Sequence, residues 1–376
     1  MNSFKDKAPL QILQSLYLSI LNLLIKLFTT LKTHTSALAS HMQAWIVKYW
    51  PLVMQQLLMF AQQLRRLITN VVDKSVILCR YTLDQIRKKF AQYWPSVKQR
   101  LMLYIKLTRL DKPTGILLLL WPTLWAVWIA AEGHPGLHLF LVFTLGVVLT
   151  RSAGCVLNDM VDRKYDVHVS RTALRPLATG LIKPDEALTV ACVLLLLAFL
   201  LVLTTNRFTV MLSFVAIPLA ILYPLMKRYT YLPQFFLGLA FSWGIPMAFA
   251  AQSETIPNIA WLLFIANILW TVVYDTIYAM VDREDDRKIG IKSTAILFDD
   301  ADKVMIGILQ LMFLAVMIII GIQMKADMLY YVSLAPAGVL MIYHQYLIRH
   351  RTPEGCFRAF LNNHWIGFTI FAGIYL

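Results

Sequence analysis

Long apolar runs alternate with short polar connections from residue 115 to the C-terminus. The nine runs lie at about 115–131, 137–157, 187–205, 208–226, 232–251, 258–281, 304–323, 328–348 and 357–375. Each is close to the roughly 20 residues that an α-helix needs to cross the hydrocarbon core of a bilayer. The pattern predicts an all-α polytopic membrane protein, in which a domain over 99–376 forms a bundle of nine transmembrane helices.

The first 98 residues follow a different pattern. Leu, Ile and Met mix with Gln, Lys and Arg at the spacing of an α-helix, and no short apolar core leads to a small-residue cleavage site. We therefore predict that 1–98 form an amphipathic helical extension on the cytoplasmic membrane surface, without a catalytic part. The stretch 10–31 leaves open a further transmembrane helix, although Lys26 and other polar residues lie within it.

The connections between the runs differ in charge. Those at 159–183, 227–231, 283–303 and 349–358 are rich in Lys and Arg, whereas the intervening connections are short and contain few. The positive-inside rule places the first set and the extension in the cytoplasm. The final helix then ends on the outer side of the membrane.

Composition supports a membrane protein and locates the positive charge. Hydrophobic residues make up 59% of the 376 residues and charged residues only 15%. Residues 1–100 carry 14 Lys/Arg and 3 Asp, a net charge of +11, whereas 101–376 carry 21 Lys/Arg and 18 Asp/Glu, a net charge of +3. Because the excess lies in the extension, it indicates contact with an anionic membrane surface rather than with nucleic acid. Four scattered cysteines and isolated histidines predict neither a disulfide framework nor a zinc site.

Three aspartates crowd the end of the second apolar run. Asn158, Asp162 and Asp166 are spaced at i, i+4 and i+8, so a helix would bring them to one side, with Asp159 beside them. Carboxylates this close repel one another unless a cation lies between them. The cluster therefore predicts a site for a divalent metal ion.

A second acidic cluster closes the sixth apolar run. Asp275, Asp282 and Asp286 fall on one helical stripe, and the last two repeat the i, i+4 spacing of the first cluster. An aspartate within a transmembrane helix costs about 2.5–3.5 kcal/mol on the insertion scale, which favours a functional reason for its presence. The neighbouring acidic residues are expected to form a solvated surface instead: Glu284, Asp285 and 299–302.

Basic residues and hydroxyl groups follow both acidic pairs. Arg171 and Thr172 come after the first pair, and Lys292 comes after the second with Ser293 and Thr294, a repetition that indicates a pseudo-duplicated bundle. Carboxylates favour Mg²⁺, which bridges to phosphate oxygens, and Arg and Lys neutralise the remaining phosphate charge. The candidates for this neutralisation are Arg171, Arg175, Lys227, Arg228 and Lys292.

The two acidic motifs resemble the signatures of the UbiA superfamily of intramembrane aromatic prenyltransferases. Asn158-Asp-x-x-Asp162-x-x-x-Asp166 looks like the first signature, and Asp282-x-x-x-Asp286 looks like the second. Other stretches are similar to bacterial members that prenylate 4-hydroxybenzoate in ubiquinone synthesis: 109–115, 120–125, 171–176, 223–228, 274–282 and 288–294. The resemblance covers about 100–376 and leaves the extension without a counterpart.

The resemblance implies a Mg²⁺-dependent transferase that moves a polyprenyl group from polyprenyl diphosphate to 4-hydroxybenzoate. It implies a multi-pass protein of the bacterial inner membrane with its active site on the cytoplasmic side. The implied catalytic residues are Asp162, Asp166, Asp282 and Asp286, which hold the metal together with Asn158 and Asp159. The residues expected at the diphosphate are Arg109, Arg171, Arg175, Tyr223, Lys227 and Lys292. Those expected at the benzoate carboxylate are Arg163 and Arg228. Besides the substrates, the expected partners are the lipid bilayer and other proteins of ubiquinone synthesis.

Two alternatives stay open. One keeps the fold but changes the prenyl acceptor to haem, a chlorophyll alcohol or a naphthoate, although the stretches 120–125 and 274–282 favour hydroxybenzoate. The other is a transporter, because intramembrane aspartates also mark ion pathways. Against a transporter, the acidic residues lie at predicted cytoplasmic helix ends beside basic connections.

Overall fold

The computed structural model describes residues 8–31, 36–167 and 172–376, and these described parts contain helices but no β-strand. The chain divides into two units, Met1–Pro95 and Ser96–Leu376. The first unit contains α1 (Ala8–Leu31) and most of α2 (Ser36–Thr108). The predicted extension is helical where it is described, and its place on a membrane surface stays a prediction. Its segments 1–7 and 32–35 lie outside the described residues.

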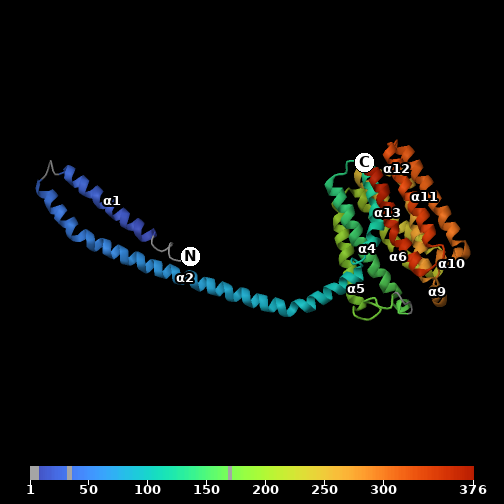
Figure 1. Ribbon diagram of the computed structural model, residues 1–376, viewed down its shortest axis with the longest axis horizontal. Helices are drawn as coiled ribbons and strands as arrows, with labels where there is room; N and C mark the ends of the chain where they lie inside the picture. The colour runs from blue at the N-terminus through green and yellow to red at the C-terminus, as the bar shows by residue number, and fades with distance from the viewer. Residues whose placement is uncertain (1–7, 32–35, 168–171) are drawn as a thin grey trace. The chain divides into compact units, whose positions relative to one another are not determined.

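The second unit is a bundle of helices that lie side by side (Figure 1). Its helices are α3 (Thr114–Ala130), α4 (Leu137–Asp166), α5 (Pro184–Val202), α6 (Arg207–Tyr229), α7 (Pro233–Ser242), α8 (Gly244–Ser253), α9 (Asn258–Ile289), α10 (Thr294–Phe298), α11 (Asp302–Met324), α12 (Met328–Leu347) and α13 (Pro353–Tyr375). Six segments of the described chain are long and apolar enough to cross a membrane: α4, α5, α6, α7 with α8, α9, and α10 with α11. The all-helical membrane fold is thus confirmed, whereas the count of nine spans stays a prediction.

Three of the apolar runs correspond to helices that differ from the single helix predicted for each. The run 232–251 forms two helices, α7 and α8, which are separated at Trp243. Pro246 lies in the first turn of α8, where its missing N–H leaves no helical hydrogen bond unmade. The helices α4 and α9 continue beyond their apolar runs to Asp166 and Ile289, so both acidic motifs are helical. Helix α9 ends at Gly290, which adopts the left-handed conformation (φ 75°) that favours glycine.

Helix α9 forms the centre of the bundle. It contacts α7, α8, α10, α11 and α13. The fully buried Trp270 of α9 packs against Trp125 of α3 and Phe313 of α11, with ring centroids 5.5 and 6.1 Å away. Each indole N–H has a partner, because Trp125 donates to the Gly367 carbonyl (3.0 Å) and Trp270 donates to Asn363 (3.2 Å). These satisfied aromatic contacts hold the helix that carries the second acidic motif.

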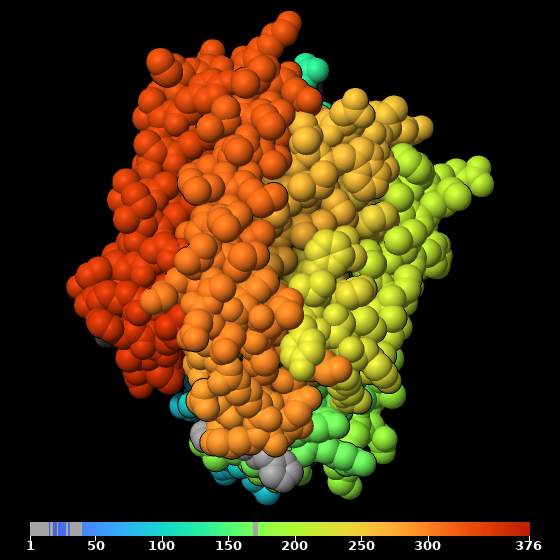
Figure 2. Space-filling model, turned by 90° about the vertical axis from the view of Figure 1, so that its right-hand side faces the viewer, coloured from blue at the N-terminus to red at the C-terminus, as the bar shows by residue number. Residues whose placement is uncertain are grey.

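The outside of the bundle is apolar. Figure 2 shows one face of this unit, on which the orange helices at the C-terminal end of the sequence lie beside the yellow and green ones. Large apolar side chains are exposed on α11 and on α6, including Leu311 (69% exposed), Ile322 (64%) and Met211 (69%). In water such a surface would be covered, so its exposure fits helices that face lipid.

Candidate active site

Both acidic motifs line one cavity. The cavity has a volume of about 980 Å³ and is walled by residues of α3, α4, α6, α7, α9 and α13 together with the α2–α3 connection. The acidic and amide side chains of the two motifs that line it are Asn158, Asp159, Asp162, Asp166, Asp275, Asp282 and Asp286, and Asp111, Gln234 and Glu354 line it from other segments. Two clusters more than 100 residues apart in the sequence therefore meet in one polar site inside an apolar bundle.

The aspartates of the first motif are buried and paired with cations. Asp159 (1% exposed) accepts hydrogen bonds from Arg109 and from Arg175 Nη1, the latter at 3.0 Å. The same Arg175 nitrogen donates to Asp166 at 2.8 Å, and Lys227 donates to Asp162. Because a buried charge is strongly unfavourable without a partner, these pairs explain how α4 can hold three carboxylates together.

Two oxygens of this motif retain capacity for a ligand. Asp162 Oδ1 is buried and has no hydrogen-bond partner in the structure. Within the described residues, the amide oxygen of Asn158 accepts only a long hydrogen bond, of 3.4 Å, from the Tyr223 hydroxyl. Carboxylate and amide oxygens are hard ligands, which suit Mg²⁺ better than softer metals. The donor set of the cavity therefore fits Mg²⁺.

The cavity suits a metal ion whose remaining ligands are substrate phosphates and water. Among the described residues, no three His, Cys, Asp or Glu side chains form a group that would hold a metal ion by themselves. Mg²⁺ is commonly bound through one or two carboxylates together with substrate phosphates and water. In this cavity, Asp162 and Asp166 on α4 and Asp282 and Asp286 on α9 would supply those carboxylates.

The predicted diphosphate residues fall mostly on the cavity wall. Arg109, Arg175, Tyr223, Lys227 and Lys292 all line it. The backbone of Lys292 donates to the Lys227 carbonyl (2.9 Å), which ties the segment after α9 to the end of α6. The remaining predicted residue, Arg171, lies outside the described residues.

The Arg109 guanidinium pairs with Asp159 of α4 and remains charged. Burial acts to lower its pKa, but the Asp159 carboxylate and other neighbouring groups outweigh this effect, so the pKa lies above its ordinary value. Its backbone adopts the left-handed conformation (φ 54°), just after α2 ends at Thr108. The turn thus directs a permanent positive charge at the first motif.

The two arginines predicted for the benzoate do not line the cavity. Arg163 is exposed, because it follows Asp162 by one residue and a helix rotates by roughly 100° per residue. Arg228 is also exposed, for the same reason relative to Lys227. It donates to the Val161 carbonyl (2.9 Å) and lies over the Tyr165 ring at 5.2 Å. Neither side chain is therefore in the position that we expected.

Sequence reasoning missed Arg151, which lines the cavity from the middle of α4. Its guanidinium contacts Cys155 Sγ and lies 6.0 Å from the Phe241 ring centroid. Its Nε is buried and has no hydrogen-bond partner in the structure. Gly115 leaves space for it, since a Cβ there would lie 2.7 Å from Arg151 Nη2. A lone arginine inside an apolar run was the signal that could have identified it.

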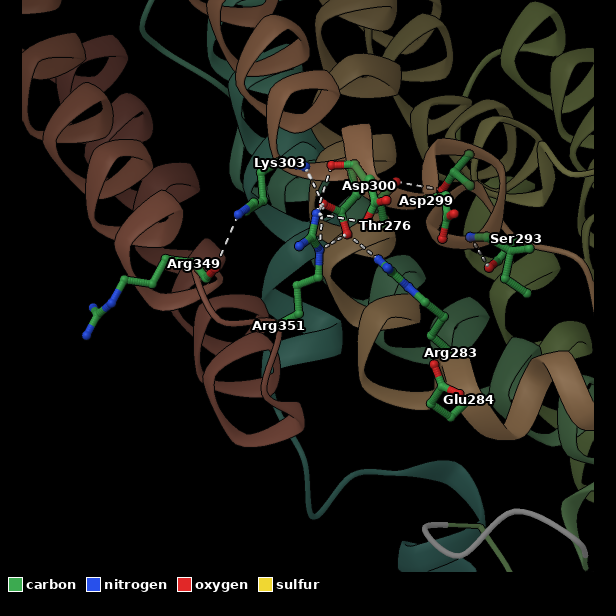
Figure 3. Close-up of polar contacts among 12 residues, drawn as sticks. Thr276, Arg283, Glu284, Ser293, Asp299, Asp300, Lys303, Arg349 and Arg351 are labelled. Atoms are coloured by element: carbon green, nitrogen blue, oxygen red, sulfur yellow. Dashed lines mark hydrogen bonds and ion pairs between the residues drawn. The ribbon is translucent and has the colours of Figure 1, made fainter.

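A buried ion cluster includes Arg283, which follows Asp282 of the second motif by one residue; Figure 3 shows its Arg283 and Arg351 side chains. Asp302, at the start of α11, is fully buried, and Arg283 of α9 donates to it. Arg351 donates to both of its oxygens at 3.0 and 3.1 Å, and also to the Asp300 carbonyl at 2.8 Å. Asp302 was expected to be solvated, and this expectation is wrong, because the first turn of α11 directs its side chain between two arginines.

The comparisons with known proteins agree with this geometry. Residues 119–367 match the model of the UbiA prenyltransferase family. The chain is 59% identical over 269 residues to the 4-hydroxybenzoate octaprenyltransferase of Aliivibrio fischeri (strain MJ11), an alignment that covers 72% of this chain and 94% of the relative. It is 56% identical over 271 residues to the 4-hydroxybenzoate octaprenyltransferase of Aeromonas hydrophila, with coverage of 72% and 94%.

Solved structures share the fold at lower identity. A UbiA homologue from Aeropyrum pernix K1 in its apo form aligns with a TM-score of 0.62 at 23% identity, over 69% of this chain and 96% of that one. A UbiA homologue from Archaeoglobus fulgidus bound to GPP and Mg²⁺ aligns with a TM-score of 0.54 at 16% identity, over 72% and 99%. The family model and these relatives together show that the chain belongs to the UbiA prenyltransferase family.

Proposed function

We propose that the chain transfers a polyprenyl group from polyprenyl diphosphate to 4-hydroxybenzoate in a Mg²⁺-dependent reaction at the cytoplasmic side of the bacterial inner membrane. The observation that carries this proposal is the meeting of two carboxylate motifs and several cations in one cavity of an apolar bundle. The relatives that share more than half of their residues with this chain act on 4-hydroxybenzoate according to their names, which supports the same acceptor here. Their names specify an octaprenyl group, so octaprenyl diphosphate is the first donor to test.

The donor diphosphate would bind between the two acidic motifs. Bound Mg²⁺ would supply positive charge to the diphosphate oxygens as the allylic carbon–oxygen bond breaks. Arg109, Arg175 and Lys227, now paired with the aspartates of α4, would neutralise the remaining phosphate charge. All three cations line the cavity, so each could exchange its carboxylate partner for a phosphate.

The acceptor would bind with its carboxylate at Arg151. This side chain is deeper in the bundle than the predicted Arg163 and Arg228, and it offers a buried donor without a protein partner. A carboxylate needs a desolvated cation of this kind, and a planar guanidinium can bind both of its oxygens. The benzoate roles of Arg163 and Arg228 stay a prediction, and the cavity favours Arg151 over both.

The reaction would be an electrophilic aromatic substitution. Loss of diphosphate leaves an allylic cation, and the apolar walls of the cavity keep water from it. The ring carbon ortho to the phenol hydroxyl attacks this cation, and the ring proton then leaves to a nearby base. The product is 3-polyprenyl-4-hydroxybenzoate and diphosphate, and the lipid tail would leave between helices into the bilayer.

The proposal is tested with purified membranes, labelled 4-hydroxybenzoate and octaprenyl diphosphate. Label should become lipid-soluble only when Mg²⁺ is present, and Asp162→Ala or Asp282→Ala should abolish the conversion. Conversion without metal, or in either variant, contradicts the proposed mechanism. Labelled haem precursors or naphthoates offered in place of hydroxybenzoate test another acceptor, and uptake of unmodified label would indicate a transporter.

Three arginine variants test the proposed binding site of 4-hydroxybenzoate. Arg151→Gln should raise the KM for 4-hydroxybenzoate strongly while leaving the KM for the donor nearly unchanged. Arg163→Gln and Arg228→Gln serve as matched controls and should change the KM for the acceptor much less. A larger increase in this KM for either control than for Arg151→Gln would favour Arg163 or Arg228 as the residue that binds the benzoate carboxylate.

A further inference from the structure

An exposed apolar stripe runs along the part of α2 that belongs to the first unit. Its members recur at intervals of three or four residues, which places them on one side of an α-helix. The apolar members are Leu57, Phe60, Leu64, Ile68, Val71, Leu78, Ile86, Phe90 and Tyr93. All of them are exposed, and Phe60, Leu78, Ile86 and Tyr93 are each more than 60% exposed. A water-exposed surface of this kind requires a covering partner.

The polar residues inside the stripe are compatible with an apolar partner. Ser75 donates its hydroxyl to the Val71 carbonyl at 2.8 Å. Thr82 donates to the Leu78 and Cys79 carbonyls at 3.0 and 2.9 Å. Because these hydroxyl protons are used within the helix, covering the stripe leaves no donor of Ser75 or Thr82 unsatisfied.

The other side of the same helix is basic. Residues 57–93 contain seven Lys/Arg and two Asp, a net charge of +5. On the half of the helix opposite the stripe lie Arg66, Lys74, Arg80, Arg87 and Lys88 together with Asp73 and Asp84, whereas Lys89 lies on the stripe side, where its long side chain can extend to the headgroups. A helix with an apolar side and a cationic side is suited to the interface of a membrane that contains anionic lipids.

We infer that this stripe binds the surface of an anionic bilayer, with its apolar side chains between the lipid headgroups and its cations at the phosphates. A second copy of the chain is the competing partner for the stripe. Two such helices would bring two net charges of +5 together, and this repulsion favours an anionic surface over self-association. The inference is independent of the proposed transferase activity.

The test uses the full-length chain in proteoliposomes with spin labels on opposite sides of α2. Cys79 lies on the stripe side and is exposed. It can be labelled in a Cys192→Ser background, because the other two cysteines of the chain are buried. The matched control carries Cys79→Ser and Asn70→Cys, nine residues away. Nine residues are about two and a half helical turns, so the two labels point in opposite directions.

Collision with oxygen, which concentrates in lipid, is compared with collision with a water-soluble nickel complex. In vesicles of phosphatidylcholine and phosphatidylglycerol, the oxygen-to-nickel ratio should be several-fold higher at Cys79 than at the Asn70→Cys label. The contrast should shrink in pure phosphatidylcholine. The difference between the two labels should also decrease when Arg66, Lys74, Arg80 and Lys88 are replaced by Gln, because their charges hold the helix on the anionic lipid.

Two results overturn the inference. Equal ratios at the two positions mean that the stripe faces water on both vesicle types. Dipolar broadening between labels at Cys79 on separate chains means that a second copy covers the stripe. Since neither measurement depends on turnover, failure of the lipid inference is distinguishable from failure of the proposed function.

Discussion

Replacement of Asp302 should destabilise the end of the bundle that carries the second acidic motif. Its carboxylate is fully buried and forms ion pairs with Arg283 and Arg351. Removing one partner of a buried ion pair costs about 3–5 kcal/mol, because the remaining charge is left without a partner in a poor solvent. For Asp302→Ala we expect about 3 kcal/mol, at the lower end of this range. The reason is that the Arg351 side chain is 32% exposed and can be rehydrated, whereas Arg283 is only 10% exposed.

Two further variants separate charge from shape. Asp302→Asn keeps an oxygen acceptor and the volume of the side chain but removes the charge, so its loss should be smaller, about 1.5–3 kcal/mol. Asp300→Asn is the matched control, because the Asp300 side chain is fully exposed, two residues away. A substitution at such a position should change the free energy of unfolding by less than about 0.5 kcal/mol.

Unfolding can be followed by a thiol-reactive fluorophore while the detergent-solubilised protein is heated. In a Cys79→Ser, Cys192→Ser background, the remaining Cys155 and Cys356 are buried and should react only as the bundle opens. Cys356 packs in the same apolar cluster as residues at the end of α9, so it reports on this region directly. If Asp302→Ala melts at the same temperature as the exposed control, the cluster does not stabilise the bundle.

Three other predictions concern turnover. Chelation of divalent metal should abolish product formation and added Mg²⁺ should restore it, whereas activity that survives chelation would contradict the metal role of Asp162 and its neighbours. A chain lacking 1–95, cut between the two units, should retain most of its kcat in a stably inserted form, and complete loss would give the extension a catalytic role. Gly115→Ala should raise the KM for 4-hydroxybenzoate, because the new Cβ would lie 2.7 Å from Arg151 Nη2 and displace this side chain; an unchanged KM would argue against Arg151 as the acceptor site.

The membrane fold and the acidic motifs were accessible from sequence because they depend on local patterns. Runs of about 20 apolar residues predict helices directly, and the spacing of Asp162 and Asp166 predicts a shared helical face. The family signature then connected the two motifs, which the structure brings to one cavity. The division of 232–251 into α7 and α8 was harder to predict, since the residues around the break, Ser242, Gly244 and Pro246, also occur within continuous transmembrane helices.

The sequence does not show which way the side chains of Arg163, Arg228 and Asp302 point. Arg163 and Arg228 are adjacent to cavity residues in sequence, but a rotation of roughly 100° per residue moves them to the surface. Asp302 looked like part of a solvated acidic segment because its partner Arg351 is 49 residues away in the sequence. Burial of such a residue depends on packing between α9, α11 and the segment before α13, which no local pattern records.

The two halves of the cavity are held in different ways. On α4, the aspartates are paired with Arg175 and Lys227, which themselves line the cavity. On α9, the ion cluster of Arg283 and Asp302 lies outside the cavity lining and is inaccessible to a substrate there. Under the proposed function, a bound diphosphate would exchange with the ion pairs of the first motif, whereas the ion cluster would hold the backbone of α9 in place. Binding of the donor should accordingly rearrange side chains on α4 and α6 around a nearly constant α9.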